Sequence, residues 1–177
     1  MLPSNGMARL AAPQCMDTRP VMPHFHVSLR MGRDKLALPS SLTAAPMPST
    51  LIEIRRACSP EQEAQLIEAV QAALVDGFRI PPEDRCVRLI AYEPHRFIHP
   101  PRLSRPECYT LVTVTAFAGR TIEAKRRLYR AIVDRLGELD IPADHITITL
   151  NEVERENWGL RGGQPASEID LGFKVDV

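Results

Sequence analysis

The sequence predicts an α+β fold: a tandem repeat of two βαβ units with four strands in one sheet and two helices on one face. Two observations predict it. A strand-like segment, a capped amphipathic helix and a second strand-like segment follow one another at about 48–93 and again at about 108–152. An Ile-Pro turn sequence also recurs at the same place in both units, at residues 80–83 and 141–144. Right-handed crossovers then make the strands of each unit parallel and put both helices on the same face.

The first unit begins with the apolar strand-like run at residues 51–54. Ser59, Pro60 and Gln62 then predict a helix start, because they match a capping box with proline at the first helical position. Apolar residues follow at helical spacing: Leu66, Val70, Ala73, Leu74 and Phe78. After a turn, residues 86–90 form the second predicted strand.

The second unit repeats this order. Residues 109–115 alternate and are rich in β-branched side chains, which is typical of a strand. Thr121 is the predicted cap of the next helix, whose apolar stripe is Leu128, Ile132, Val133 and Leu136. Residues 145–150 form the last strand of the unit. We expect residues 94–106 to be the loop that joins the two units.

Composition excludes several functions. The 177 residues are 44% hydrophobic and 25% charged with formal net charge +0, which fits one domain with a core and gives no electrostatic footprint for nucleic acid. No apolar run reaches the roughly 18 residues of a membrane helix, so we expect no membrane partner. The four cysteines lack CxxC spacing and the histidines lack a ligand pattern. We therefore expect no metal site, and reduced thiols in a cytoplasmic protein.

The composition changes near residue 47, because all six methionines lie in residues 1–47. Residues 1–46 show scattered prolines and no sustained periodicity, so we interpret them as a disordered extension, or as residues upstream of the true start. A transit peptide is an alternative, since the segment is rich in arginine and poor in acids. Residues 47–177 form the predicted domain, which is completed by a C-terminal hairpin.

Three local motifs, in order and downstream of Met47-Pro48, carry a family resemblance. They are Ile-Pro-Pro-Glu-Asp-Arg at 80–85, Gly-Arg-Thr-Ile-Glu-Ala-Lys at 119–125, and Asn-Trp-Gly-Leu-Arg-Gly-Gly at 157–163. With the duplicated βαβ unit, they resemble the tautomerase superfamily of 4-oxalocrotonate tautomerase, macrophage migration inhibitory factor and malonate semialdehyde decarboxylase. The resemblance covers residues 47–177. It is greatest to fused double-unit members of the decarboxylase branch.

The resemblance implies a catalytic N-terminal proline, which here is Pro48, exposed when Met47 is removed. The chemistry needs a free secondary amine, whereas a proline inside a chain has an amide nitrogen that is not basic. We therefore predict that the functional protein begins at Pro48. The implied reaction is cofactor-independent keto–enol tautomerisation of a small 2-oxo or unsaturated acid, with Pro48 as general base.

The resemblance also implies roles for four further residues. Arg120 corresponds to the arginine that binds the substrate carboxylate, and Asp84 to the aspartate that activates water or positions a polar group. Arg88 and Trp158 correspond to a substrate-binding arginine and to an aromatic wall beside the proline. Without the resemblance, spacing alone favours a solvated cap residue for Arg120. Asp84 is then equally a turn residue, and Trp158 a core residue. Strand alternation places Arg88 on the same face as Asp84.

Departures from the family pattern leave alternatives open. Cys58 stands where single-unit members carry an arginine, which predicts one site per chain, and Arg120 stands alone where the decarboxylase carries two arginines. The alternatives are a hydratase or decarboxylase acting on a small 3-oxo acid, and a non-catalytic trimeric family member if Pro48 is not N-terminal. We expect a homotrimer in each case, because the sheet face without helices needs cover.

Overall fold

The structure, a computed structural model, describes residues 48–160 and 162–170. The predicted extension at residues 1–46, and Met47, lie outside the described residues. The domain boundary therefore stays a prediction.

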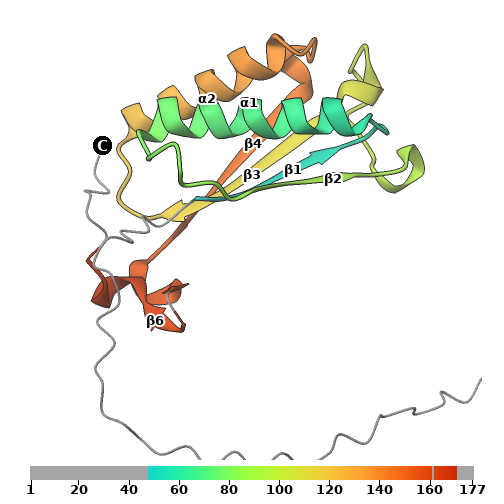
Figure 1. The fold of residues 1–177 in the computed structure, drawn as a ribbon. Helices are drawn as coiled ribbons and strands as arrows, with labels where there is room; N and C mark the ends of the chain where they lie inside the picture. The colour runs from blue at the N-terminus through green and yellow to red at the C-terminus, as the bar shows by residue number, and fades with distance from the viewer. Residues whose placement is uncertain (1–47, 161, 171–177) are drawn as a thin grey trace, which may run out of the picture. The chain divides into compact units, whose positions relative to one another are not determined.

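Four strands form one sheet in the order β2-β1-β3-β4 (Figure 1). Neighbours β1 and β2 are parallel, as are β3 and β4, whereas the central pair β1 and β3 is antiparallel. This arrangement confirms the predicted tandem βαβ fold. The strands are β1 (Ser49–Ile54), β2 (Val87–Ala91), β3 (Thr110–Phe117) and β4 (Ile146–Val153).

Helices α1 (Pro60–Phe78) and α2 (Ile122–Gly137) lie side by side on one face of the sheet (Figure 1). The capping box of α1 is present: the Ser59 hydroxyl accepts from the Gln62 amide, and the Gln62 side chain accepts from the Ser59 amide. In α2 the Thr121 hydroxyl accepts from the Ala124 amide at 3.2 Å. Within the described ranges, neither helix is long and apolar enough to cross a bilayer.

The core lies between the sheet and the two helices. Alternate residues of the central strands point into it, which explains the period-two pattern of the sequence. The predicted helical stripes complete it, except for Val133, which is half-buried and lies outside this core. Its fully buried members include Ile52, Ile54, Val70, Leu74, Phe78, Val112, Val114, Leu128, Ile132 and Leu136.

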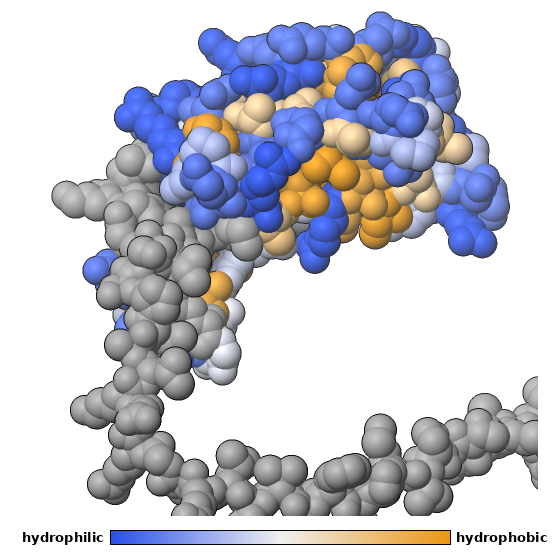
Figure 2. Space-filling model, in the orientation of Figure 1, coloured by the Kyte–Doolittle hydropathy of each residue, from blue (hydrophilic) through white to orange (hydrophobic). Residues whose placement is uncertain are grey.

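The opposite face of the sheet is less protected. The intervening residues of β1 and β3 are half-buried rather than buried. Figure 2 shows a group of apolar residues on the sheet side below the helices, with mostly hydrophilic surface over the helices. The half-buried residues of this face include Ser49, Leu51, Glu53, Leu111, Thr113 and Thr115.

The remaining elements are short. The loop between the units contains two 3-10 turns, Pro94–Arg96 and Pro106–Cys108. After β4, strands β5 (Gly159–Leu160) and β6 (Gln164–Pro165) pair antiparallel as a small hairpin.

Close approach of the two helices depends on Gly77. A Cβ atom at this position would lie 2.5 Å from the Leu128 Cα atom of α2. We expect Gly77→Ala to lower the free energy of unfolding by about 1–3 kcal/mol, because backbone atoms must move to admit the methyl group. Gly137→Ala is the matched control, since its Cβ meets nothing within 4 Å. Urea unfolding of both variants checks this, and equal stabilities would contradict the close helix contact.

Candidate active site

The strand register brings three predicted site residues to one end of the sheet. Pro48 immediately precedes β1. The Thr50 amide of β1 donates to the Cys86 carbonyl at 2.9 Å, and this bond holds the turn containing Asp84 beside the start of β1. Ser49 lies opposite Thr115, so the end of β3, and the loop with Arg120 that follows it, reach the same end. Pro48 itself is buried.

Arg120 is a buried arginine held by α1. Its side chain is 7% exposed, its Nη1 donates to the Phe78 carbonyl at 2.9 Å, and its Cζ lies 4.4 Å from the centroid of the Phe78 ring. Gly119 permits the sharp approach of the loop, since its φ is +105°. Arg120 is therefore not a solvated cap residue.

The charge of Arg120 has no acidic partner among residues 48–160 and 162–170. Its Nε is buried and donates no hydrogen bond within this part of the chain. Burial also lowers the pKa of Arg120. A buried guanidinium without a carboxylate is costly, so this position favours binding of an anion from outside the described chain.

Asp84 is a buried acid in a turn. Its amide donates to the Pro81 carbonyl at 3.0 Å, and its own carbonyl accepts from Gln71 Nε2 at 2.8 Å. Its side chain is 7% exposed, and Oδ2 has no hydrogen-bond partner in the described chain. Burial, with a smaller contribution from the Glu83 charge, raises the pKa of Asp84 to about 6. A carboxyl group with this pKa is suited to exchanging protons near neutral pH.

We expect the cost of burying Asp84 to depend on pH. Because its folded pKa of about 6 exceeds the ordinary value of about 3.9, ionisation weakens the fold as the pH rises through this window. Asp84→Asn should change stability little at pH 4 and raise it by up to about 3 kcal/mol at pH 8. Thermal or urea unfolding from pH 4 to 8 measures this. A gain that does not grow with pH would contradict the account.

Trp158 lies at the same end of the sheet. It is half-buried, and its ring packs edge-to-face on Phe117, the last residue of β3, with 5.1 Å between centroids. Leu160, Ala166 and Ile169 complete this small cluster. The Trp158 ring thus packs on the end of β3, at the sheet end that holds the predicted site.

Arg88 also lies near the start of β1. Its Nη2 donates to the Ser49 hydroxyl at 3.1 Å, next to Pro48, and its side chain is exposed. Arg88 and Asp84 do not share a strand face as predicted, because β2 begins at Val87 and Asp84 lies in the preceding turn.

Sequence reasoning missed the roles of Gln71 and Phe78. Both belong to the buried face of α1, and each contacts one predicted site residue, Asp84 or Arg120. Phe78 belongs to the predicted apolar stripe of the helix. The helical spacing of that stripe explains why Phe78 is buried, but it does not predict the contact with Arg120. The sequence feature that could have indicated a role for Gln71 is its place as a polar residue beside the apolar positions Val70 and Leu74.

A surface cavity of about 240 Å³ lies between α1 and the turn that carries Asp84. Neither Asp84 nor Arg120 lines it. Its walls are formed by Glu68, Gln71, Ala72, Val75, Asp76, Pro82 and Arg85.

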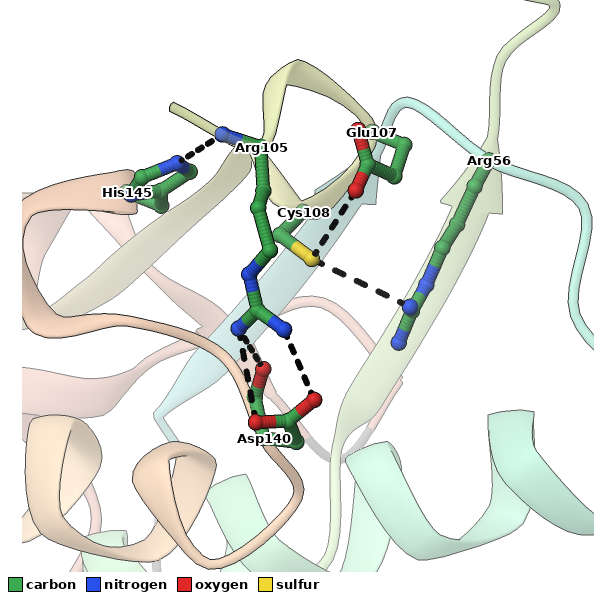
Figure 3. Close-up of polar contacts among 6 residues, drawn as sticks. All are labelled: Arg56, Arg105, Glu107, Cys108, Asp140 and His145. Atoms are coloured by element: carbon green, nitrogen blue, oxygen red, sulfur yellow. Dashed lines mark hydrogen bonds and ion pairs between the residues drawn. The ribbon is translucent and has the colours of Figure 1, made fainter. Parts of the chain in front are cut away.

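A second polar cluster lies at the opposite end of the sheet, where β1 ends and β3 and β4 begin (Figure 3). In it Arg105 binds Asp140, and the Arg105 amide donates to Nε2 of the fully buried His145 at 3.0 Å. These groups satisfy one another and tie the inter-unit loop to the second unit. The cluster in Figure 3 consists of Arg56, Arg105, Glu107, Cys108, Asp140 and His145. Across residues 48–160 and 162–170, no three His, Cys, Asp or Glu side chains are grouped to hold a metal ion.

The fold and this sheet end define a class of protein: a duplicated βαβ unit with a buried, unpaired arginine, a buried acid and a proline at the start of the first strand. A family model described as "Tautomerase enzyme" matches residues 84–161. FG41 malonate semialdehyde decarboxylase, in a structure inhibited by 3-bromopropiolate, is 30% identical, with a TM-score of 0.60 over 67% of this chain and 92% of that one. The chain belongs to the tautomerase superfamily.

Other relatives agree with this membership. Probable tautomerase YusQ of Bacillus subtilis (strain 168) is 25% identical over 67% of this chain and 96% of that protein. A fused 4-OT trimer has 22% identity and a TM-score of 0.61, over 68% of this chain and 97% of that one. At that identity the likeness concerns the fold alone.

Proposed function

We propose that this protein is a cofactor-independent tautomerase that uses Pro48 as general base on a small 2-oxo or unsaturated acid. The observation that carries the proposal is the buried Arg120, whose charge has no carboxylate partner in the described chain. It lies at the sheet end where the register places Pro48. A small carboxylate substrate supplies the missing anion.

In this mechanism Arg120 binds the substrate carboxylate, and the neutral Pro48 nitrogen takes the proton from the enol hydroxyl. As the C=O bond forms, the carbon–carbon double bond takes that proton back from the same nitrogen at the conjugated carbon, which completes the change from enol to ketone. An α-amino group titrates at about 7.7–8.0, and burial beside a guanidinium lowers this pKa and favours the free base. Trp158 limits access of water, and Arg88 lies near enough to β1 to assist binding.

The mechanism requires that Pro48 end the polypeptide. We propose that the working protein begins there, after removal of Met47 and of any residues before it. The position of Pro48 directly before β1, at the sheet end that also holds Arg120, supports this interpretation.

Asp84 favours a second candidate function, hydration or decarboxylation of a small 3-oxo acid. Its pKa of about 6 lets it hold or accept a proton near neutral pH. The 30% identical relative is a malonate semialdehyde decarboxylase. In this candidate a protonated Pro48 polarises the substrate and Asp84 directs water. A non-catalytic family member, with Pro48 blocked, is the remaining alternative.

We further propose that three copies cover the helix-free sheet faces and form a homotrimer. The half-buried residues of β1 and β3 on that face support association. The fused 4-OT structures are trimers by their descriptions. Light scattering of the protein that begins at Pro48 tests this, and a monodisperse monomer would contradict it.

The function is tested with protein that begins at Pro48. Phenylpyruvate and 2-hydroxymuconate report ketonisation, and malonate semialdehyde reports decarboxylation. The tautomerase proposal predicts ketonisation that survives Asp84→Asn. Decarboxylation that is lost in Asp84→Asn would instead favour the lyase, and no turnover of any substrate would favour the non-catalytic alternative.

A further inference from the structure

Gln71 is the one polar residue among the buried residues of α1. It is 4% exposed and lies on the face that packs against the core. Its Nε2 donates to the main-chain carbonyl of Asp84 at 2.8 Å. A buried amide is costly unless it is hydrogen-bonded, so an apolar residue would serve a purely packing role at lower cost.

The bond acts on the main chain that carries Asp84. The turn at residues 81–86 has no regular secondary structure. Three hydrogen bonds hold its main chain, and its Arg85 side chain pairs with Glu68 of α1. The Asp84 amide bonds Pro81, the Cys86 carbonyl bonds Thr50 of β1, and the Asp84 carbonyl bonds Gln71. Of these three, the Gln71 bond is the one that comes from a helix. It therefore fixes the Asp84 main chain relative to α1.

We propose that Gln71 is a positioning residue that sets the location of Asp84 in the active site without touching the substrate. The inference rests on the second candidate function, in which Asp84 directs water. It also explains how the first unit, which has Cys58 at its own arginine position, contributes to the single site of the second unit. Its helix holds Asp84 through Gln71 and Arg120 through Phe78.

The charges around this turn make a neutral donor important. Glu83 adjoins Asp84 and raises its pKa. On the outer side, Glu68 of α1 pairs with Arg85, and Asp76 pairs with Arg135 of α2. A glutamate at position 71 would place a further negative charge beside Asp84, whereas glutamine donates a hydrogen bond at every pH.

This difference gives a pH-dependent test. In Gln71→Glu the side chain donates to the Asp84 carbonyl only while it is protonated. For malonate semialdehyde, whose turnover depends on Asp84 in the second candidate function, we expect that variant to keep near wild-type kcat at low pH and to lose about 10- to 100-fold relative to wild type as the introduced carboxyl group ionises. Gln71→Leu should lose a similar factor at all pH values. Gln65→Leu, at an exposed glutamine of the same helix, is the control and should be unchanged.

Carbon-13 NMR titration of the Asp84 carboxyl in the protein that begins at Pro48 provides a readout besides activity. We expect the pKa of Asp84 to rise in Gln71→Glu and to differ from the wild-type value in Gln71→Leu. If both variants fold with a wild-type Asp84 titration and an unchanged kcat–pH profile, Gln71 is only structural and the proposal is wrong. If no protein turns over substrate, the proposed function fails, while the NMR result still decides whether Gln71 positions Asp84.

Discussion

A chain that retains Met47 in front of Pro48 is expected to turn over substrate at least about 10²-fold more slowly than a chain that begins at Pro48. Acylation converts the proline nitrogen into an amide, which has no basic lone pair. The two proteins differ by one residue at the start of β1, so the fold and Arg120 are unchanged. Steady-state kinetics on the same substrate measure the ratio.

Two further observations sharpen this comparison. A chain that begins with Ala in place of Pro48 keeps an amine, although a primary and more mobile one, and should fall between the other two. The kcat/KM profile of the Pro48 protein should also show a rising limb at a pKa below about 7.7–8.0, which the Met47 protein lacks. Equal rates for the Pro48 and Met47 proteins would remove Pro48 from the mechanism.

Replacement of Arg120 is expected to have the second large effect on activity. Arg120→Lys should lower kcat/KM by about 10²–10³-fold, because lysine keeps the charge and loses both the planar fork and the stacking on Phe78. For substrates bound through a carboxylate, we expect most of this decrease in kcat/KM to result from a higher KM. Arg127→Lys, at an exposed position of α2, is the matched control.

The same variants can be tested without turnover. A non-reactive dicarboxylate should bind the wild-type protein and the Arg127→Lys protein alike in calorimetry, and bind Arg120→Lys far more weakly. Unchanged affinity in Arg120→Lys would show that the buried guanidinium serves the fold rather than the substrate.

Most of the fold could be predicted from interactions between residues that are close in the sequence. The helix caps at Ser59 and Thr121 are contacts between residues three positions apart, and strand alternation is a pattern of neighbouring residues. Both can therefore be recognised directly in the sequence. The parallel order of each unit then follows from the helix that connects its two strands, and the right-handedness of these crossovers puts both helices on one face. This is why the four-stranded sheet with two helices on one face could be predicted without coordinates.

The site depends on contacts that periodicity does not encode. Arg120 meets Phe78, and Asp84 meets Gln71, across 42 and 13 residues of sequence. The raised pKa of Asp84 results from burial, which only the packed turn creates. The common face proposed for Arg88 failed for a related reason, since strand alternation stops where β2 begins, at Val87.

The most direct test of the central claim is the intact mass of active protein purified from its native source. The account predicts a chain whose first residue is Pro48 with an unmodified amine, and activity that co-purifies with that species. Full turnover by a chain in which Met47 is still bonded to Pro48 would contradict it.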